Sequence, residues 1–208
     1  TRGDGVQGDD VTENVKTISA DWKYQLHNVG GEVVLEGRQY TGNMLGFDLY
    51  SSKIINAKGV TTINKSTITV DGGNGVNPSD PNYHAYTGLV NENEAVLNLN
   101  ESFVSDTRAD GEYAILNFGE LNVNDTEVRG SGYGILNDTK TLSTGIVVRG
   151  MVNVVGTGSF IYADNGYGIR NNVFQQSDVG TGGQEIVYTV VVDGANVAGS
   201  LGSFYNIN

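Results

Sequence analysis

The stretch Val123-Asn124-Asp125-Thr126-Glu127-Val128 decides the fold, because its pattern returns along most of the chain. The pattern is an apolar residue, an Asn, a variable residue, a small residue, another variable residue and a second apolar residue. It returns at residues 63–68 and 99–104, with weaker copies at 155–160 and 192–197. A repeat of this size has to be interpreted first, because repeated units build a different class of fold from a single globular core.

A second phrase, Tyr-x-Ile-x-Asn, follows most copies of the first. It occupies residues 113–117, 133–137 and 167–171, and a copy at 86–91 is one residue longer. The shortest distance between successive Tyr residues, from Tyr113 to Tyr133, indicates a basic unit of about 20 residues. Each unit contains apolar runs of two to five residues, rich in Val, Ile and Leu, that end at Gly, Asn or Asp. Such runs predict short strands and turns, because they are too short and too β-branched for helices.

This pattern predicts an all-β chain, folded as a right-handed parallel β-helix with loop insertions. In such a solenoid, similar residues lie above one another at a spacing of about 4.8 Å. Asn at a repeated position suits a turn, because it tolerates left-handed backbone and its amide can bond to its counterpart in the next unit. An antiparallel sandwich is the alternative fold. The Asn residues expected to form structural corners are Asn64, Asn100 and Asn124, and Asn117, Asn137 and Asn171.

The whole chain is expected to form one elongated domain. Residues 1–30 fit the repeat poorly and predict a cap that uses Trp22 and nearby apolar residues to cover the first unit. Residues 31–208 are expected to form the stacked units. The chain stops at residue 208 within a partial Tyr phrase, so we expect it to be part of a longer surface protein.

Composition narrows the possible partners. The chain has a net charge of −12 with only 12 Lys and Arg, which argues against nucleic acid and anionic membranes as partners. No apolar run is long enough to cross a membrane, so direct membrane insertion of this segment is not expected. Cysteine is absent, which is compatible with export through an oxidising compartment.

Residues 119–135 (GELNVNDTEVRGSGYGI) resemble the repeat units of the passenger domains of type V autotransporters, the pertactin-like adhesins of Gram-negative bacteria. They are also similar to pectin-lyase-like adhesive domains of other bacterial surface proteins. The resemblance covers about residues 50–208 and concerns the style of the repeat. It implies secretion to the bacterial surface, with an outer-membrane anchor in the full-length protein. It also implies non-catalytic attachment to a host glycan or protein, or to another copy of the chain.

The loop 71–85 (DGGNGVNPSDPNYHA) is the segment most typical of a binding site. It holds both prolines of the chain, which pre-order a loop, and it carries side chains suited to hydrogen bonding and stacking. A decorative, solvated loop is the alternative. The candidate binding residues are Asp71, Asn74, Asp80, Asn82, Tyr83 and His84.

An enzyme is the main alternative function, since polysaccharide lyases and glycoside hydrolases also use β-helices. Hydrolysis requires carboxylates that converge on one face, and lyases require a Ca²⁺ site and a base. The nearest candidates, Asp106, Asp125 and Asp193, fall at different offsets of the repeat. We therefore expect no catalytic residues, no metal and no cofactor. A purely structural stalk is a third alternative.

Three further motifs have structural interpretations as well as functional ones. Arg2-Gly3-Asp4 spells an integrin-binding tripeptide near the start of the chain. The Tyr residues of the second phrase can form a packing ladder or a surface for sugars. Four Asn-x-Ser/Thr glycosylation sequons begin at Asn64, Asn100, Asn124 and Asn137, where the turns already favour Asn.

Overall fold

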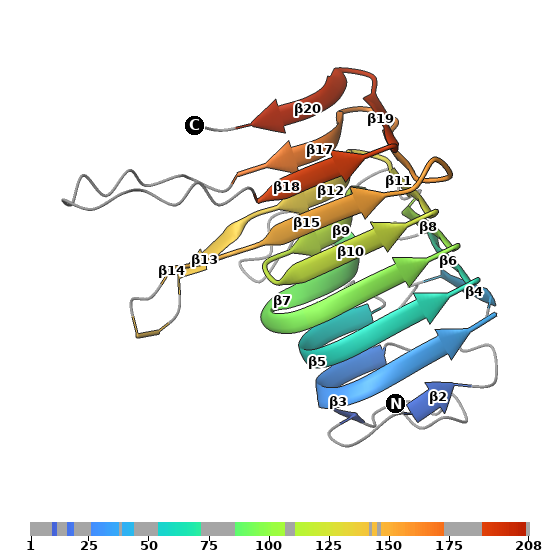
Figure 1. Cartoon of the computed structure of the whole chain (residues 1–208), viewed down its shortest axis with the longest axis vertical. Helices are drawn as coiled ribbons and strands as arrows, with labels where there is room; N and C mark the ends of the chain where they lie inside the picture. Colours follow the sequence, from blue (N-terminus) through green and yellow to red (C-terminus); the bar gives the residue numbers. More distant parts are fainter. Residues whose placement is uncertain are drawn as a thin grey trace.

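In the computed structural model, the described part of the chain consists of β-strands and short turns (Figure 1). The structure describes residues 10–11, 16–18, 26–37, 39–43, 54–71, 86–106, 111–141, 143–144, 147–172 and 189–206. The strands are β1 (Asp10–Val11), β2 (Lys16–Ile18), β3 (Leu26–Glu36), β4 (Gln39–Asn43), β5 (Ile54–Asn64), β6 (Thr67–Asp71), β7 (Tyr86–Asn100), β8 (Phe103–Asp106), β9 (Gly111–Asn117), β10 (Glu120–Asn124), β11 (Glu127–Gly130), β12 (Tyr133–Asn137), β13 (Thr139–Thr141), β14 (Val147–Arg149), β15 (Met151–Val155), β16 (Phe160–Ala163), β17 (Tyr167–Asn171), β18 (Val190–Asp193), β19 (Asn196–Gly199) and β20 (Gly202–Asn206).

The strands pair in parallel in three columns, which we name after the phrases that form them. The Tyr column contains the first halves of β3, β5 and β7, followed by β9, β12, β17 and β20. The Asn column contains the second halves of β3, β5 and β7, followed by β10, β15 and β18. The third column is the six-stranded sheet of β4, β6, β8, β11, β16 and β19. Among the described strands, β13 and β14 form the one antiparallel pair, so the antiparallel sandwich is wrong.

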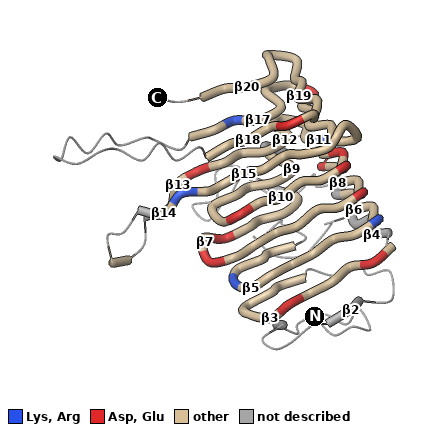
Figure 2. Tube along the Cα trace, viewed as in Figure 1, with Lys and Arg blue, Asp and Glu red and all other residues tan. Residues whose placement is uncertain are grey.

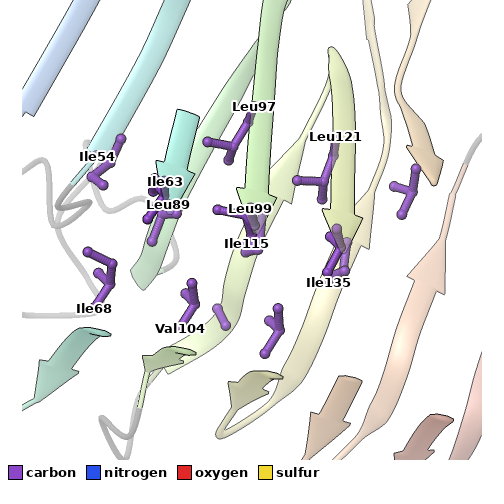
Figure 3. Close-up of a cluster of buried hydrophobic side chains, with 14 of the residues drawn as sticks. Ile54, Ile63, Ile68, Leu89, Leu97, Leu99, Val104, Ile115, Leu121 and Ile135 are labelled. Atoms are coloured by element: carbon purple, nitrogen blue, oxygen red, sulfur yellow. The ribbon is translucent and has the colours of Figure 1, made fainter. Parts of the chain in front are cut away.

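The register keeps equivalent residues of successive units opposite one another. Ile63 pairs with Leu99, Leu99 with Val123, Val123 with Val154, and Val154 with Val192. These residues point inward because alternate residues of a strand face opposite sides. The core is therefore a set of apolar ladders, part of which is shown in Figure 3. Burial of each Leu or Ile side chain contributes roughly 1.5–3 kcal/mol, which makes these ladders the main source of stability.

The turn between the Asn column and the third column uses left-handed backbone at the residue after the Asn. Lys65, Glu101 and Asp125 have φ angles of 48°, 47° and 43°. The expectation that Asn itself is left-handed is therefore wrong at this corner. The Asn residues end their strands instead and stay in register with the next unit.

A buried ladder of hydroxyl groups supports this turn from inside. The hydroxyls of Ser66, Ser102 and Thr126 each donate to the carbonyl oxygen two residues earlier, at 2.7, 2.7 and 2.9 Å. The backbone N–H of Ser66 donates to Ser102 Oγ, that of Ser102 to Thr126 Oγ1, and that of Thr126 to Ser159 Oγ. The small residue in the sequence phrase is therefore the hydroxyl that satisfies the buried turn.

The stacking begins within the segment that the sequence assigned to the cap. Strand β3 starts at Leu26, which is buried and pairs with Ile54 of β5. The short strands β1 and β2 pair with the other edge of β3. Trp22 lies outside the described residues. Between β12 and β15, the antiparallel strands β13 and β14 project from the side where β3, β5 and β7 bend (Figure 1).

Candidate functional site

The outer side of the Asn column carries a row of polar side chains, which we call the amide face. Its central members are Thr62, Asn98, Asn122 and Asn153, which pair in this order across β5, β7, β10 and β15. They face outward because the residues on either side of each, such as Leu97 and Leu99, fill the core. Strand alternation thus places one polar side chain per unit at the same height above the sheet.

Hydrogen bonds connect part of the amide face along the stack. Asn98 Nδ2 donates to Thr62 Oγ1 at 3.2 Å, and Asn122 Nδ2 donates to Asn98 Oδ1 at 3.0 Å. The Asn122 amide also donates to the carboxylate of Glu120 in its own strand. Asn153 is exposed and has no side-chain hydrogen bond to another described residue. Hydrogen bonds therefore hold the side chains from Thr62 to Asn122 in place, whereas the amide of Asn153 is available to a partner.

The predicted corner residues Asn64, Asn100 and Asn124 form the border of the amide face. Asn64 pairs with Asn100, and Asn100 with Asn124, in the parallel register. Asn100 Nδ2 donates to Asn64 Oδ1 at 2.9 Å, and Asn64 Nδ2 donates to Glu36 Oε2 at 2.9 Å. All three side chains are partly exposed, so they belong to the outer surface as well as to the turn.

The predicted corner residues Asn117, Asn137 and Asn171 lie at the bend between the Tyr and Asn columns. The first two are fully buried. Asn117 Nδ2 donates to Asn137 Oδ1 at 2.8 Å, and Asn137 Nδ2 donates to Asn171 Oδ1 at 2.9 Å. Further bonds to backbone carbonyls satisfy the bend, so the amides of Asn117 and Asn137 act structurally and are not accessible to a ligand.

Four further Asn residues, which were not among the predicted corners, extend this ladder at its two ends. Asn28, Asn56 and Asn91 precede it, with amide bonds of 3.0, 2.9 and 2.8 Å that each lead to the next Asn. Asn206 accepts from Asn171 at the far end. Each of the first three is the third residue of an apolar–x–Asn segment, as in Leu89-Val90-Asn91, so a search for that shorter signal would have found them.

The Tyr residues stack on one another along the outside of the Tyr column. The ring centroids of Tyr113 and Tyr133 are 5.5 Å apart, and those of Tyr133 and Tyr167 are 6.4 Å apart. The Arg170 guanidinium lies 5.3 Å from the centroid of Tyr133. Because neighbouring rings cover one another's faces, this ladder favours packing over a platform for sugar rings. Tyr86 is out of register, since its backbone pairs with Gly111.

The candidate binding loop falls outside the described residues apart from its first residue. Asp71 ends β6, and its backbone pairs with Asn43. Asn74, Asp80, Asn82, Tyr83 and His84 lie outside the described residues, as do Arg2 and Asp4. The binding role of the loop therefore stays a prediction.

In the described part of the chain, charged residues lie mainly at the bends and ends of the strands (Figure 2). Lys58 and Glu94 form an exposed ion pair at 2.8 Å. Its hydrogen bond and charge attraction lower the pKa of Glu94 and raise the pKa of Lys58. The hydrogen bond between Arg129 and Asp164 likewise raises the pKa of Arg129.

The acidic residues that came nearest to a catalytic set lie in different parts of the fold. Asp106 ends β8 in the third column, Asp193 ends β18 in the Asn column, and Asp125 lies in a turn. Within the described ranges, no three His, Cys, Asp or Glu side chains group closely enough to hold a metal ion. The same part of the chain contains no helix that is long and apolar enough to span a membrane.

Comparisons of this chain with protein-family models, curated proteins and solved structures found no match.

Proposed function

We propose that this chain is a right-handed parallel β-helical segment of a secreted bacterial surface adhesin. The links between β10 and β11 and between β11 and β12 are two residues long, yet each of these strands pairs in parallel with the equivalent strand of the next unit. A chain that makes such short links while its columns stay parallel has to wind around one axis. Right-handed winding is supported by the strong preference of parallel crossover connections for that hand.

The amide face is the single observation that carries the adhesive function. Across β5, β7, β10 and β15 it presents polar side chains in register, and its border adds the three partly exposed Asn residues described above. Side-chain amides both donate and accept hydrogen bonds, so a flat row of them suits an extended partner that presents its own repeated polar groups. A second copy of the chain and a host glycan both meet that requirement.

Self-association along this face would gain strength through repetition. A single hydrogen bond between exposed groups contributes little, because water competes for both partners. Contacts repeated at each unit act together, since the first aligned pair raises the effective concentration of the next. The amides carry no charge themselves, and the carboxylates bonded to this row and its border are those of Glu36 and Glu120, in a chain with a net charge of −12.

Sedimentation velocity over a concentration series tests this function. The wild-type chain is expected to form dimers or larger species as its concentration rises, and Asn153→Arg is expected to suppress them. Asn196→Arg is the matched control, because Asn196 is also an exposed Asn but pairs in the third column, with Phe160. Both substitutions change the net charge equally. If both variants lose association to the same extent, the amide face is not the contact between copies.

Attachment to host material is tested separately. Deletion of residues 72–84 is expected to lower binding to host cells or to a glycan array if the predicted loop supplies the contacts. Unchanged binding would remove the loop from the proposal. A wild-type chain that stays monomeric and binds neither cells nor glycans would leave the stalk as the better interpretation.

A further inference from the structure

Two of the four glycosylation sequons have the same sequence but opposite environments. Asn124-Asp125-Thr126 and Asn137-Asp138-Thr139 are both Asn-Asp-Thr. Asn137 is fully buried, and its Nδ2 donates to the carbonyl oxygen of Gly150 and to Asn171 Oδ1, both at 2.9 Å. A sugar on this nitrogen would have to occupy the interior and would break the buried ladder.

The remaining three sequons place their Asn on the outer border of the amide face. Two of these amides already donate hydrogen bonds, from Asn64 to Glu36 and from Asn100 to Asn64. Asn124 Nδ2 donates to no other residue in the described part of the chain. The amide bonds of this border run toward the preceding unit, from Asn100 to Asn64 and from Asn64 to Glu36, and the run does not continue from Asn124 to its register partner Asn100.

We propose that Asn124 is an acceptor for an N-linked glycan and that, in the folded protein, it carries the sugar in preference to the other three sequons. The donor would be an oligosaccharide attached through a diphosphate to a lipid. Asn124 Nδ2 forms a bond to the anomeric carbon while the bond from that carbon to the diphosphate oxygen breaks. The lipid diphosphate leaves, and the amide nitrogen loses one proton to a base. This modification goes beyond the proposed adhesion, and because Asn124 borders the amide face, a sugar there would hinder close packing of two such faces.

The structure also places the reaction before folding. The sequon requires the hydroxyl of Thr126 as well as the Asn. That hydroxyl is fully buried, donates to the carbonyl oxygen of Asn124 at 2.9 Å and accepts from the N–H of Ser102 at 3.0 Å. A transferase therefore meets this sequon in the unfolded chain, and folding then accepts a sugar at Asn124 but not at Asn137.

The test is expression of the full chain through a eukaryotic secretory pathway that glycosylates such sequons. The folded, monodisperse fraction is separated from aggregates, and occupancy at each sequon is measured by peptide mass spectrometry after enzymatic release of the sugar. Occupancy at Asn124 is expected to exceed that at Asn137 by at least about tenfold, because modification of Asn137 would break buried hydrogen bonds. Because both sites have the sequence Asn-Asp-Thr, a difference in occupancy between Asn124 and Asn137 cannot come from the sequon itself.

Two variants complete the test. Asn124→Gln is expected to remove most of the attached sugar while leaving stability nearly unchanged. Ala198→Ser creates a control sequon at the exposed Asn196, which reports whether the host modifies a surface site of this chain. Folded protein with sugar at Asn137, or with Asn124 unmodified, would overturn the proposal. So would folded protein in which Asn64 or Asn100 is more highly occupied than Asn124.

Discussion

Replacing Asn117 by Asp tests the central role of the buried amide ladder without changing side-chain volume. Asn117 Nδ2 donates to the carbonyl oxygens of Gly119 and Met151, both at 3.0 Å, and to Asn137 Oδ1 at 2.8 Å. Its own Oδ1 accepts from Asn91 at 2.8 Å. In Asn117→Asp, a carboxylate oxygen takes the place of the amide nitrogen and faces the three oxygen atoms that had accepted its hydrogen bonds. Because an ionised carboxylate has no hydrogen to donate, all of these donated hydrogen bonds are lost.

The magnitude follows from the two hydrogens that the Asn117 amide nitrogen shares among these three acceptors. At roughly 1 kcal/mol for each hydrogen, their loss costs about 2 kcal/mol, and an uncompensated buried carboxylate raises the expected loss to about 3–5 kcal/mol at pH 7. Burial raises the pKa of the new carboxyl above its unfolded value of about 3.9. The destabilisation is therefore complete at pH 7 and shrinks as the pH falls toward about 4, where the neutral acid again donates one hydrogen bond.

Urea unfolding at pH 7 and pH 4 measures this effect. Asn98→Asp is the control, because Asn98 also donates a side-chain hydrogen bond, to Thr62 Oγ1, but is partly exposed on the amide face. Its expected loss is below about 1 kcal/mol at either pH. If the two variants lose equal stability at pH 7, or if their difference does not narrow at pH 4, the reasoning about the buried ladder is refuted.

Three further predictions concern other parts of the stack. Thr126→Val is expected to cost about 1–3 kcal/mol, because it leaves a buried backbone N–H without its acceptor, whereas Thr126→Ser should cost less in the same urea experiment. Gly134→Ala is expected to lower the free energy of unfolding by about 1–3 kcal/mol, since a Cβ there would lie 2.6 Å from the carbonyl oxygen of Gly168; an unchanged melting temperature would contradict this. Lys58→Met is expected to raise the pKa of Glu94 toward its ordinary value, as followed by NMR titration, and high salt should reduce the difference from the wild type.

Much of the architecture was readable from the repeat because the same residue types recur at the same steps. Apolar residues such as Leu99 and Val123 can form one ladder only if their strands run parallel and in register, and they do pair in this way. The same logic places Asn64 beside Asn100. The binding loop is different, because it has no repeated counterpart whose position constrains it.

The conformation predicted from the sequence was wrong at the turn between the Asn column and the third column. The sequence suggested that Asn takes the left-handed conformation, whereas Lys65, Glu101 and Asp125 do so. The physical reason is that a strand-ending Asn can bond to its counterpart in the next unit only if it keeps the register of the strand. The turn then falls on the following residue, whose backbone N–H still donates to the next unit, as from Lys65 to Asn100 and from Glu101 to Asn124, and which accepts the small cost of left-handed backbone.

By itself, the sequence determined the length of the unit, the parallel stacking and the composition of the core ladders, because periodicity specifies which residues must meet. Tertiary structure alone decided which Asn residues face the interior. The tripeptide Asn-Asp-Thr occurs at both 124 and 137, yet Asn124 is partly exposed and Asn137 is fully buried. The difference arises because Asn124 borders an outer face, whereas Asn137 lies at an inward bend where carbonyl groups from neighbouring units need its amide.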